Sequence, residues 1–228
     1  MLDNLNFAVK EGEFLCIVGP SGCGKSTLLD LIAGHLKPQE GEIIVDGEVI
    51  TSPGVDRIPV FQEHGLFPWL NVEENIAFGL KFFGSPPKDE REIIKEMVEL
   101  IGLQGFEKAY PHQLSGGMKQ RVALARALAP DPEILLMDEP FGSLDALTRS
   151  ELHHEIQRIH EETNKTILFV THDLMEASLL GDRVILLSHR PSHIKKEVKI
   201  DLKRPRFKHH SKVISIAHQM EEYLKPKP

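Results

Sequence analysis

The sequence of 228 residues is long enough for one large α/β domain, or for one domain that carries an inserted subdomain. Its apolar fraction of 41% and charged fraction of 27% are ordinary for a soluble globular protein, and its net charge of −7 argues against broad nucleic-acid binding, which needs a positive surface. No stretch approaches the roughly 18 apolar residues of a membrane-spanning helix, and the N-terminus lacks the features of a signal peptide, so any membrane role must come through a partner.

The first part of the chain is rich in predicted strands. Leu5, Phe7 and Val9 alternate with polar or small residues, which predicts a half-buried strand. The continuous apolar run 14–18 predicts a strand buried on both faces. Further along we expect a helix, a hairpin and a short strand, at 25–33, 41–49 and 58–61 respectively. Cys16 and Cys23 form neither a disulfide framework nor a metal-binding spacing, which is typical of a reducing cytosolic setting.

A glycine-rich loop joins the buried strand to the first helix. Its residues match the pattern G-x-x-x-x-G-K-S, and they are Gly19, Pro20, Ser21, Gly22, Cys23, Gly24, Lys25, Ser26 and Thr27. The glycines allow backbone N–H groups to turn inward around phosphate oxygens, and the following helix adds its positive dipole end. Lys25 supplies a charge to the outer phosphates and Ser26 a hydroxyl to a magnesium shell. The loop therefore predicts a nucleotide site.

The middle of the chain, from about residue 68 to 128, is predicted to be mostly helical, with apolar residues at helical spacing over 93–101. Strand character returns at 134–137, 167–170 and 184–187. Residues 195–206 form a basic stretch, and a last helix is expected to end near Tyr223. A strand–helix core with a helical insertion predicts a mainly parallel sheet.

Polar residues end the later strands where they can meet the phosphate loop. The strand 134–137 runs into Asp138, which suits a metal-associated acid, and Glu139, which suits the polarisation of an attacking water. His172 ends the next strand and is a candidate donor to the terminal phosphate. Gln62 follows the strand 58–61 and could sense the metal or the water.

The segment Leu114–Met118 precedes a helix and offers a second anion-binding surface. Ser115, Gly116 and Gly117 present a hydroxyl and backbone N–H groups at the helix start. One chain with one phosphate loop has no obvious use for two such surfaces. A two-fold dimer solves this, because the second surface of each chain can close the nucleotide of the other.

These motifs together resemble the ABC transporter ATPases over nearly the whole chain. The phosphate loop is similar to their Walker A motif, Gln62 to their Q-loop, 114–118 to their signature and 134–139 to their Walker B motif. Ser143-Leu144-Asp145 resembles their D-loop and His172 their switch histidine. The resemblance implies a P-loop NTPase (RecA-like) α/β core with an antiparallel β portion and an inserted α-helical signature subdomain. The expected core is 1–67 with 130–206, the helical subdomain 68–129, and the C-terminal helix and tail 207–228.

The resemblance also implies the roles of the site residues. ATP and Mg²⁺ are expected at Lys25, Ser26, Gln62 and Asp138, and two chains are expected to close head to tail with Ser115, Gly116 and Gly117 on the partner's terminal phosphate. Glu139 would orient water, His172 would stabilise charge, and Asp145 would communicate between the two sites.

Two stretches, 60–69 and 137–149, look most like importers of the nitrate, sulfonate or taurine type, and 198–206 points the same way. The resemblance implies membrane permease subunits that dock near Gln62 and Phe67–Trp69, and indirectly a solute-binding protein, but no nucleic acid. The chain would then be cytoplasmic and peripheral on the inner face of the membrane. The aromatic residues of 67–69 could instead belong to the core of the subdomain.

Two departures from the family pattern stand out. Met118 occupies a signature position where glutamine is commonest, with little effect expected because the anion contacts come from serine and glycine. The family also usually has an aromatic residue upstream of the phosphate loop that stacks on adenine, for roughly 1–3 kcal/mol. Either the start of this sequence is truncated, or another group covers the base.

Two other functions stay open from the sequence alone. One is a non-transport ABC ATPase, such as a cluster-assembly ATPase. The other is a nucleotide-binding regulatory module with impaired turnover, which the absent aromatic residue favours mildly and which Glu139 and His172 argue against.

Overall fold

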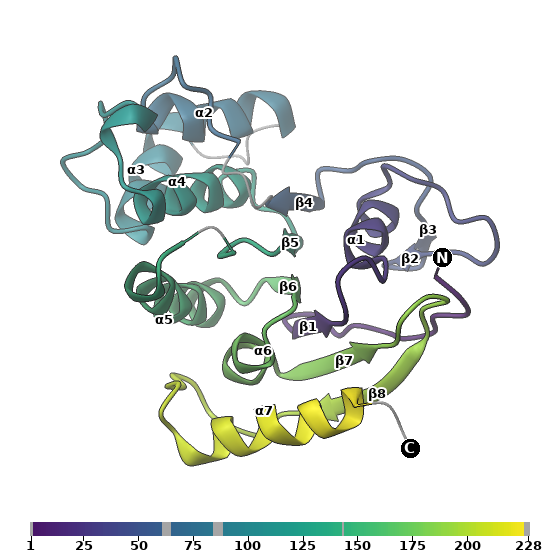
Figure 1. The fold of residues 1–228 in the computed structure, drawn as a ribbon. Helices are drawn as coiled ribbons and strands as arrows, with labels where there is room; N and C mark the ends of the chain where they lie inside the picture. Colours follow the sequence, from purple (N-terminus) through teal and green to yellow (C-terminus); the bar gives the residue numbers. More distant parts are fainter. Residues whose placement is uncertain (1, 61–64, 84–88, 143, 226–228) are drawn as a thin grey trace.

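The computed structural model describes residues 2–60, 65–83, 89–142 and 144–225, and Figure 1 shows the fold. Its strands are β1 (Phe14–Val18), β2 (Ile44–Val45), β3 (Glu48–Val49), β4 (Arg57–Val60), β5 (Ile134–Asp138), β6 (Thr166–Thr171), β7 (Arg183–Leu187) and β8 (Ile194–Lys199). Its α-helices are α1 (Lys25–Ala33), α2 (Val72–Phe83), α3 (Glu90–Leu100), α4 (Gly116–Leu128), α5 (Ala146–Thr163), α6 (Leu174–Leu180) and α7 (Ser211–Leu224).

A six-stranded sheet in the order β4-β5-β6-β1-β7-β8 forms the centre of the fold. Its first five strands pair in parallel, and β8 pairs antiparallel with β7 at the edge. The hairpin β2-β3 forms a separate two-stranded antiparallel sheet. In the described part of the chain, no helix is long and apolar enough to cross a membrane.

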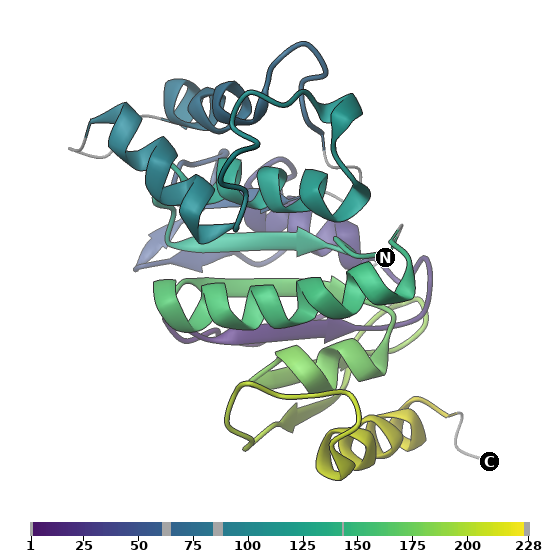
Figure 2. The ribbon, with the colours of Figure 1, turned by 90° about the vertical axis from the view of Figure 1, so that its left-hand side faces the viewer.

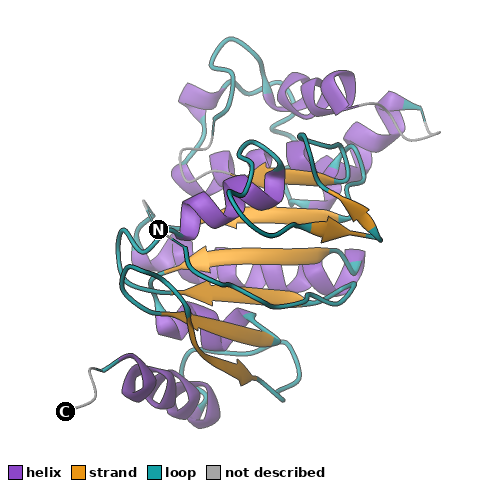
Figure 3. Ribbon diagram, turned by 90° about the vertical axis from the view of Figure 1, so that its right-hand side faces the viewer, coloured by secondary structure: helices purple, strands orange, loops and turns teal. Residues whose placement is uncertain are grey.

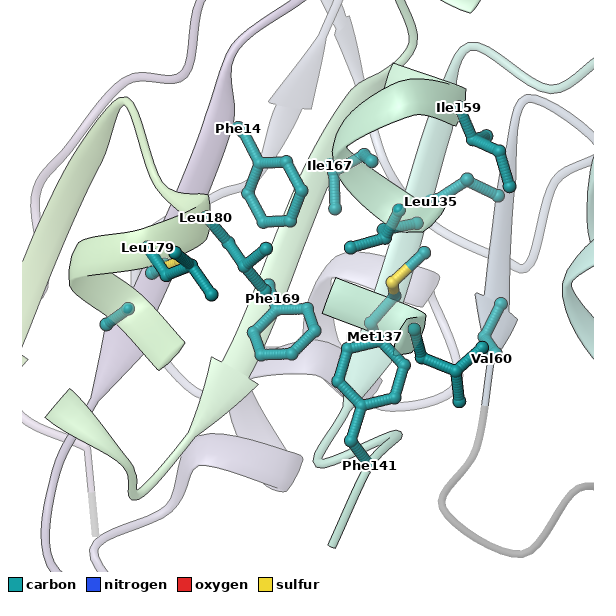
Figure 4. Packing of buried hydrophobic residues seen from close by; sticks show 14 of the residues in the cluster. Phe14, Val60, Leu135, Met137, Phe141, Ile159, Ile167, Phe169, Leu179 and Leu180 are labelled. Carbon is teal, nitrogen blue, oxygen red and sulfur yellow. The ribbon is translucent and has the colours of Figure 1, made fainter. Parts of the chain in front are cut away.

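Helices cover both faces of this sheet (Figures 2 and 3). Successive residues of a strand point to opposite faces, so Leu15 and Ile17 of β1 pack with α1, whereas Phe14, Cys16 and Val18 pack on the side of α5, α6 and α7. Figure 4 shows the core on the side of α5, α6 and α7. Aromatic rings from three separate segments, Phe14, Phe141 and Phe169, pack there among aliphatic side chains. All five residues of β1 are at most 1% exposed, so the phosphate loop is anchored in the most buried strand of the sheet.

Helices α2, α3 and α4 gather beyond the β4 edge of the sheet, with a hydrophobic cluster of their own (Figure 1). Helix α4 belongs to both parts: Val122 and Ala125 enter the helical cluster, whereas Leu124 and Leu128 enter the core of the sheet. The mixed α/β fold with its parallel core and helical lobe confirms the predicted fold class. The proposed subdomain limits at 68 and 129 stay a prediction.

One local prediction was wrong, and one strand was missed. Leu5, Phe7 and Val9 are half-buried against the α1-side core, but residues 3–10 form no strand, because they do not pair with a neighbouring backbone in a ladder. Conversely, the basic stretch 195–206 begins with β8, a strand that the pattern did not indicate. Its side chains are mostly exposed at the sheet edge, where lysines are compatible with a strand that has only one neighbour.

Candidate functional site

The carboxyl ends of three adjacent strands bring the predicted functional residues together. The loop that starts at Gly19 follows β1, Glu139 follows β5, and His172 follows β6. Because β5, β6 and β1 are neighbours in the sheet and run parallel, their ends open at one edge. Ligands of open α/β sheets bind at this kind of edge.

The phosphate loop has the backbone that only glycine adopts easily. Gly22 and Gly24 have φ of 76° and 112°, and no atom lies within 4 Å of a Cβ built at Gly22. At Gly19 such a Cβ would lie 2.8 Å from the Cys23 Sγ, so this glycine permits close packing of the loop on itself. Gly24 caps α1 without a side-chain hydrogen bond, and the first turn of the helix contains no acidic residue. The helix start therefore favours an anion.

Lys25 lies inside the loop and is only 6% exposed. Its Nζ donates hydrogen bonds to the carbonyl oxygens of Gly19 at 3.0 Å and Pro20 at 3.3 Å. The same ammonium lies 3.7 Å from the Glu139 Oε1. The charge thus stands between the loop and the strand end that carries the acidic pair.

Glu139 contacts both Lys25 and His172. Its Oε2 lies 2.9 Å from the Nδ1 of His172, while its Oε1 faces Lys25. Its φ of +45° is unusual for a residue with a side chain and costs about 1–3 kcal/mol. The backbone holds this conformation through the Glu139 N–H, which donates to the Val170 carbonyl at 2.9 Å. Such strain is concentrated at functional sites, and here the carboxylate contacts both Lys25 and His172.

Asp138 is the last residue of β5 and has the environment of a cation ligand. Burial raises its pKa and the neighbouring Glu139 carboxylate adds to the rise, whereas a hydrogen bond from Ser26 and the Lys25 ammonium oppose it. A half-buried carboxylate beside a hydroxyl is an oxygen-only donor set, which is the set that Mg²⁺ prefers. Ser26 and Asp138 therefore fit the expected magnesium ion.

The second predicted anion surface lies at the start of α4. Ser115 caps the helix by accepting a hydrogen bond from the Met118 N–H at 3.2 Å, and it is exposed together with Gly116. Gly117 is buried against Thr148 of α5, where a Cβ would lie 2.5 Å from the Thr148 Cγ2. Within the described residues, no recorded hydrogen bond or ion pair joins 115–117 to the phosphate loop. The structure thus leaves this surface outside the cluster of Lys25, Glu139 and His172.

Asp145 lies next to this surface, as the N-cap of α5. Its carboxylate accepts hydrogen bonds from the N–H groups of Leu147 and Thr148, at 3.0 and 3.1 Å, and from the Thr148 hydroxyl at 2.6 Å. The bond from the Thr148 hydroxyl, followed by those from the backbone, lowers the pKa of Asp145. The residue is exposed, so its charge is available at the surface of the chain.

Two predicted positions, Gln62 and Ser143, lie outside the described residues. Beyond that gap, an aromatic cluster begins at Phe67, whose ring centroid lies 4.2 Å from that of Phe78 and 5.5 Å from that of Trp69. Phe82 extends it, 5.0 Å from Phe78. Trp69 is 69% exposed, so this ring lies on the surface of the helical lobe and not in its core.

Sequence reasoning missed two supports of the site. The Ser192 hydroxyl donates to the Cys23 carbonyl and so ties the phosphate loop to the segment between β7 and β8. Behind His172, a buried network joins Thr171, Glu176 and His153. Neither belongs to a local motif, because the partners lie 169 and 23 residues apart, and the only usable signal was an acidic residue one turn after the Asp173 cap.

Comparison with known proteins decides the family. Residues 2–142 match the family described as ABC transporter. The chain belongs to this family. The resemblance to the sulfonate and taurine importer type is also confirmed, since the chain is 51% identical over 208 residues to the aliphatic sulfonates import ATP-binding protein SsuB of Bacillus anthracis, with 91% of this chain and 82% of that protein covered.

Other relatives agree. The chain is 55% identical over 205 residues to an uncharacterized ABC transporter ATP-binding protein of Methanocaldococcus jannaschii, covering 90% of this chain and 77% of that one. It is 47% identical over 199 residues to the taurine import ATP-binding protein TauB of Roseobacter denitrificans, covering 87% and 74%. Among solved structures, it resembles a dimeric ATP-binding cassette in a post-hydrolysis state bound to ADP and Pi, with a TM-score of 0.74 and 36% identity over 89% of this chain and 91% of that one.

Proposed function

We propose that this chain is the ATP-hydrolysing subunit of an ABC importer for a sulfonate, taurine, nitrate or a similar small solute. The convergence of Lys25, Glu139 and His172 at one edge of the sheet carries this proposal. The printed names of the curated relatives, which are import ATP-binding proteins for sulfonates and taurine, support the importer type. They give no support to a cluster-assembly ATPase or to a regulatory module.

In this proposal the phosphates of ATP occupy the loop 19–27. The Lys25 ammonium gives up its hydrogen bonds to the two loop carbonyls and its contact with Glu139, and it binds the outer phosphates instead. The negative charge of the phosphates makes these new hydrogen bonds stronger. Ser26 and Asp138 hold Mg²⁺, with Gln62 as a further ligand, and the ion neutralises charge on the phosphates.

Glu139 accepts a hydrogen bond from the attacking water and so orients it for in-line attack. Its carboxylate already faces the loop, since its Oε1 lies 3.7 Å from the Lys25 ammonium. His172, which is 62% exposed in the single chain, donates a hydrogen bond to the terminal phosphate and stabilises the charge on it as the bond breaks. Its contact with Glu139 keeps the two groups on one side of the phosphate.

The proposed working unit is a head-to-tail homodimer. Ser115, Gly116 and Gly117 would cover the terminal phosphate bound to the partner chain, because the exposed start of α4 offers hydrogen-bond donors and a positive dipole end that the chain does not use for its own phosphate loop. Asp145, which is bonded to Thr148 beside Gly117, would connect the two sites. The likeness to dimeric cassettes supports this arrangement.

The proposed membrane partner is a permease subunit that contacts the aromatic cluster, Phe67, Trp69, Phe78 and Phe82. An exposed tryptophan next to stacked rings is an anchor of the kind that interface hot spots use. The chain would then be cytoplasmic and held at the inner face of the membrane by that permease, which receives its solute from a binding protein.

This assignment is tested by detergent extraction of the tagged chain from its own cells, with the integral membrane proteins that copurify identified by mass spectrometry. We expect permease subunits to copurify with the wild-type chain. For Trp69→Ala we expect their yield to fall about tenfold or more, since removal of a hot-spot ring costs roughly 2 kcal/mol or more of binding free energy. Phe106→Ala, which removes an exposed aromatic ring elsewhere in the helical lobe, serves as the control and should retain them. An undiminished yield with Trp69→Ala would contradict the proposed contact, and an extract without membrane subunits would contradict the importer.

A further inference from the structure

A buried polar network lies directly behind the His172 segment. The Thr171 hydroxyl donates a hydrogen bond to the Glu176 Oε2 at 2.7 Å and accepts one from the Asp173 N–H at 3.0 Å. The hydroxyl thus ties the backbone on the far side of His172 to the end of β6 on the near side. The two residues that flank His172 are fixed to each other through one oxygen atom, and that oxygen is fixed to Glu176.

Glu176 is in turn held by α5. Its Oε1 lies 3.1 Å from the Nε2 of His153, which is 1% exposed. A carboxylate can only accept, so the imidazole carries its proton on Nε2. Burial raises the pKa of Glu176, but the hydrogen bonds from His153 and Thr171, with the charge of Arg149, outweigh it and the pKa lies below its ordinary value. Glu176 is therefore an ionised group with two directional donors.

The same imidazole also braces the segment that carries Glu139. The His153 ring packs edge-to-face against Phe141, with 5.3 Å between ring centroids and an interplanar angle of 75°. Phe141 is 4% exposed and lies two residues after Glu139. One side chain of α5 consequently contacts the segment of Glu139 directly, and it reaches the segment of His172 through Glu176 and Thr171.

Buried polar groups are expensive unless they are paired, and an apolar core would stabilise the junction of α5, α6 and β6 at least as well. Hydrogen bonds differ from apolar contacts in fixing direction. A threonine hydroxyl bonded on both sides restrains the turn 171–173, and this turn carries the otherwise exposed His172 ring.

We propose that Thr171, Glu176 and His153 are positioning residues that hold His172 against Glu139 for hydrolysis. The proposal rests on the hydrolytic role of His172 assigned above. It makes α5, whose N-cap Asp145 lies next to the proposed dimer surface, part of the support of the site.

The test uses Thr171→Val, which keeps the shape of the side chain and removes the hydroxyl. We expect the kcat for ATP to fall about tenfold, as for one lost hydrogen bond to a charged group, with KM changed less than twofold. Thr171→Ser returns the hydroxyl and should restore most of the rate. If Thr171→Val fails to fold, Glu176→Gln takes its place in the test. This variant keeps the shape of the side chain but weakens the acceptor, so it should also lower kcat.

The matched control is Thr166→Val at the opposite end of the same strand. The Thr166 hydroxyl is also buried and accepts a hydrogen bond from the Gly12 N–H at 3.0 Å, but it does not contact the site. Its loss should lower stability without lowering kcat. Thr171→Val should have no further effect in a His172→Ala background, because it acts through that ring. A wild-type kcat in Thr171→Val, or an equal further loss in the His172→Ala background, would overturn the proposal.

A readout without turnover separates this proposal from the assigned function. The readout is the NMR spectrum of protein that is isotopically labelled at histidine, in which the His172 ring resonances are the ones absent from His172→Ala. We expect these resonances to shift in Thr171→Val and to stay in place in Thr166→Val. Resonances that do not shift in Thr171→Val would overturn the positioning role. Shifted resonances in a chain that hydrolyses no ATP would overturn the hydrolytic role alone.

Discussion

At the scale of residues, the centre of the site consists of three polar side chains that contact one another. These side chains form a row: the Glu139 carboxylate lies in the middle, with the Lys25 ammonium at one oxygen and the His172 imidazole at the other. A nucleotide that enters the loop replaces some of these contacts. In the proposed function, the phosphates would therefore meet these groups already gathered at one edge of the sheet.

The residues of this row could be predicted from the sequence. Glu139 and His172 each follow an apolar strand, and the ends of parallel strands share an edge, whereas Lys25 belongs to a recognisable phosphate-loop pattern. The supporting residues could not. Glu176 and His153 lie 23 residues apart on two helices, and only tertiary packing brings them together. The positive φ of Glu139 was equally invisible, since it depends on the hydrogen bond to Val170 of the neighbouring strand.

Buried histidines also make the stability of the fold depend on pH. Burial lowers the pKa of His160, the nearby Arg204 charge adds to this, and Asp182 opposes it. The folded pKa thus lies below the unfolded value of about 6.5. As pH falls from about 6.5 toward the folded pKa, the unfolded chain takes up a proton that the folded chain refuses, so the stability of the fold decreases.

We therefore expect the free energy of unfolding, measured by urea titration, to fall between pH 7 and pH 5, and to fall less in His160→Gln. The amide of glutamine can still donate to the Gly12 carbonyl that now lies 3.1 Å from the His160 Nε2. His218→Gln replaces an exposed histidine and should leave the wild-type slope unchanged. An unchanged slope in His160→Gln would show that other groups cause the loss.

At the scale of elements, the contact between α4 and α5 connects the second anion surface to Asp145. A Cβ at Gly117 would lie 2.5 Å from the Thr148 Cγ2, and Thr148 cannot simply turn away because its hydroxyl is bonded to Asp145. The glycine thus permits the close approach of the two helices. At Gly116, by contrast, the nearest atom to a built Cβ is the end of the flexible Leu144 side chain, at 3.1 Å.

Gly117→Ala should consequently lower the free energy of unfolding by about 1–3 kcal/mol, the usual cost of overpacking, whereas Gly116→Ala should be nearly neutral. Thr148→Ser removes the offending methyl group and keeps the hydroxyl, so it should restore part of the loss in a double variant. Chemical denaturation of the four chains checks this. Equal effects of the two alanine variants would mean that helix propensity, and not the contact, governs this position.

The sequence patterns predicted the elements well where burial was complete and poorly at the edges of the fold. Buried strands such as β1 and β6 appear as continuous apolar runs. The segment 3–10 shows the alternation of a strand without the ladder, because an alternating pattern reports which side chains are buried and not whether the backbone has a partner. Strand β8 has the partner but too few buried side chains for a recognisable pattern.

At the scale of the whole molecule, the proposed homodimer would give each chain one half of each of two sites. The phosphate loop, Asp138, Glu139 and His172 lie at one edge of the sheet, and the exposed start of α4 offers a separate surface for an anion. In the proposed homodimer these halves meet across the interface. Hydrolysis can then be completed only when both chains are closed, which would couple the chemistry to a movement that a permease attached at the aromatic cluster can follow.

A site that two chains complete is tested most directly by the rate of Mg²⁺-dependent ATP hydrolysis, measured for the wild-type chain and three variants. Glu139→Gln should lose nearly all activity, because a neutral amide accepts a weaker hydrogen bond from the attacking water than a carboxylate does. Ser115→Asp should also lose it, since aspartate still caps α4 but sets a negative charge against the partner's phosphate, whereas the neutral cap in Ser115→Asn should retain much of the rate. Full activity in Glu139→Gln, or equal rates in the two Ser115 variants, would contradict a site that two chains complete.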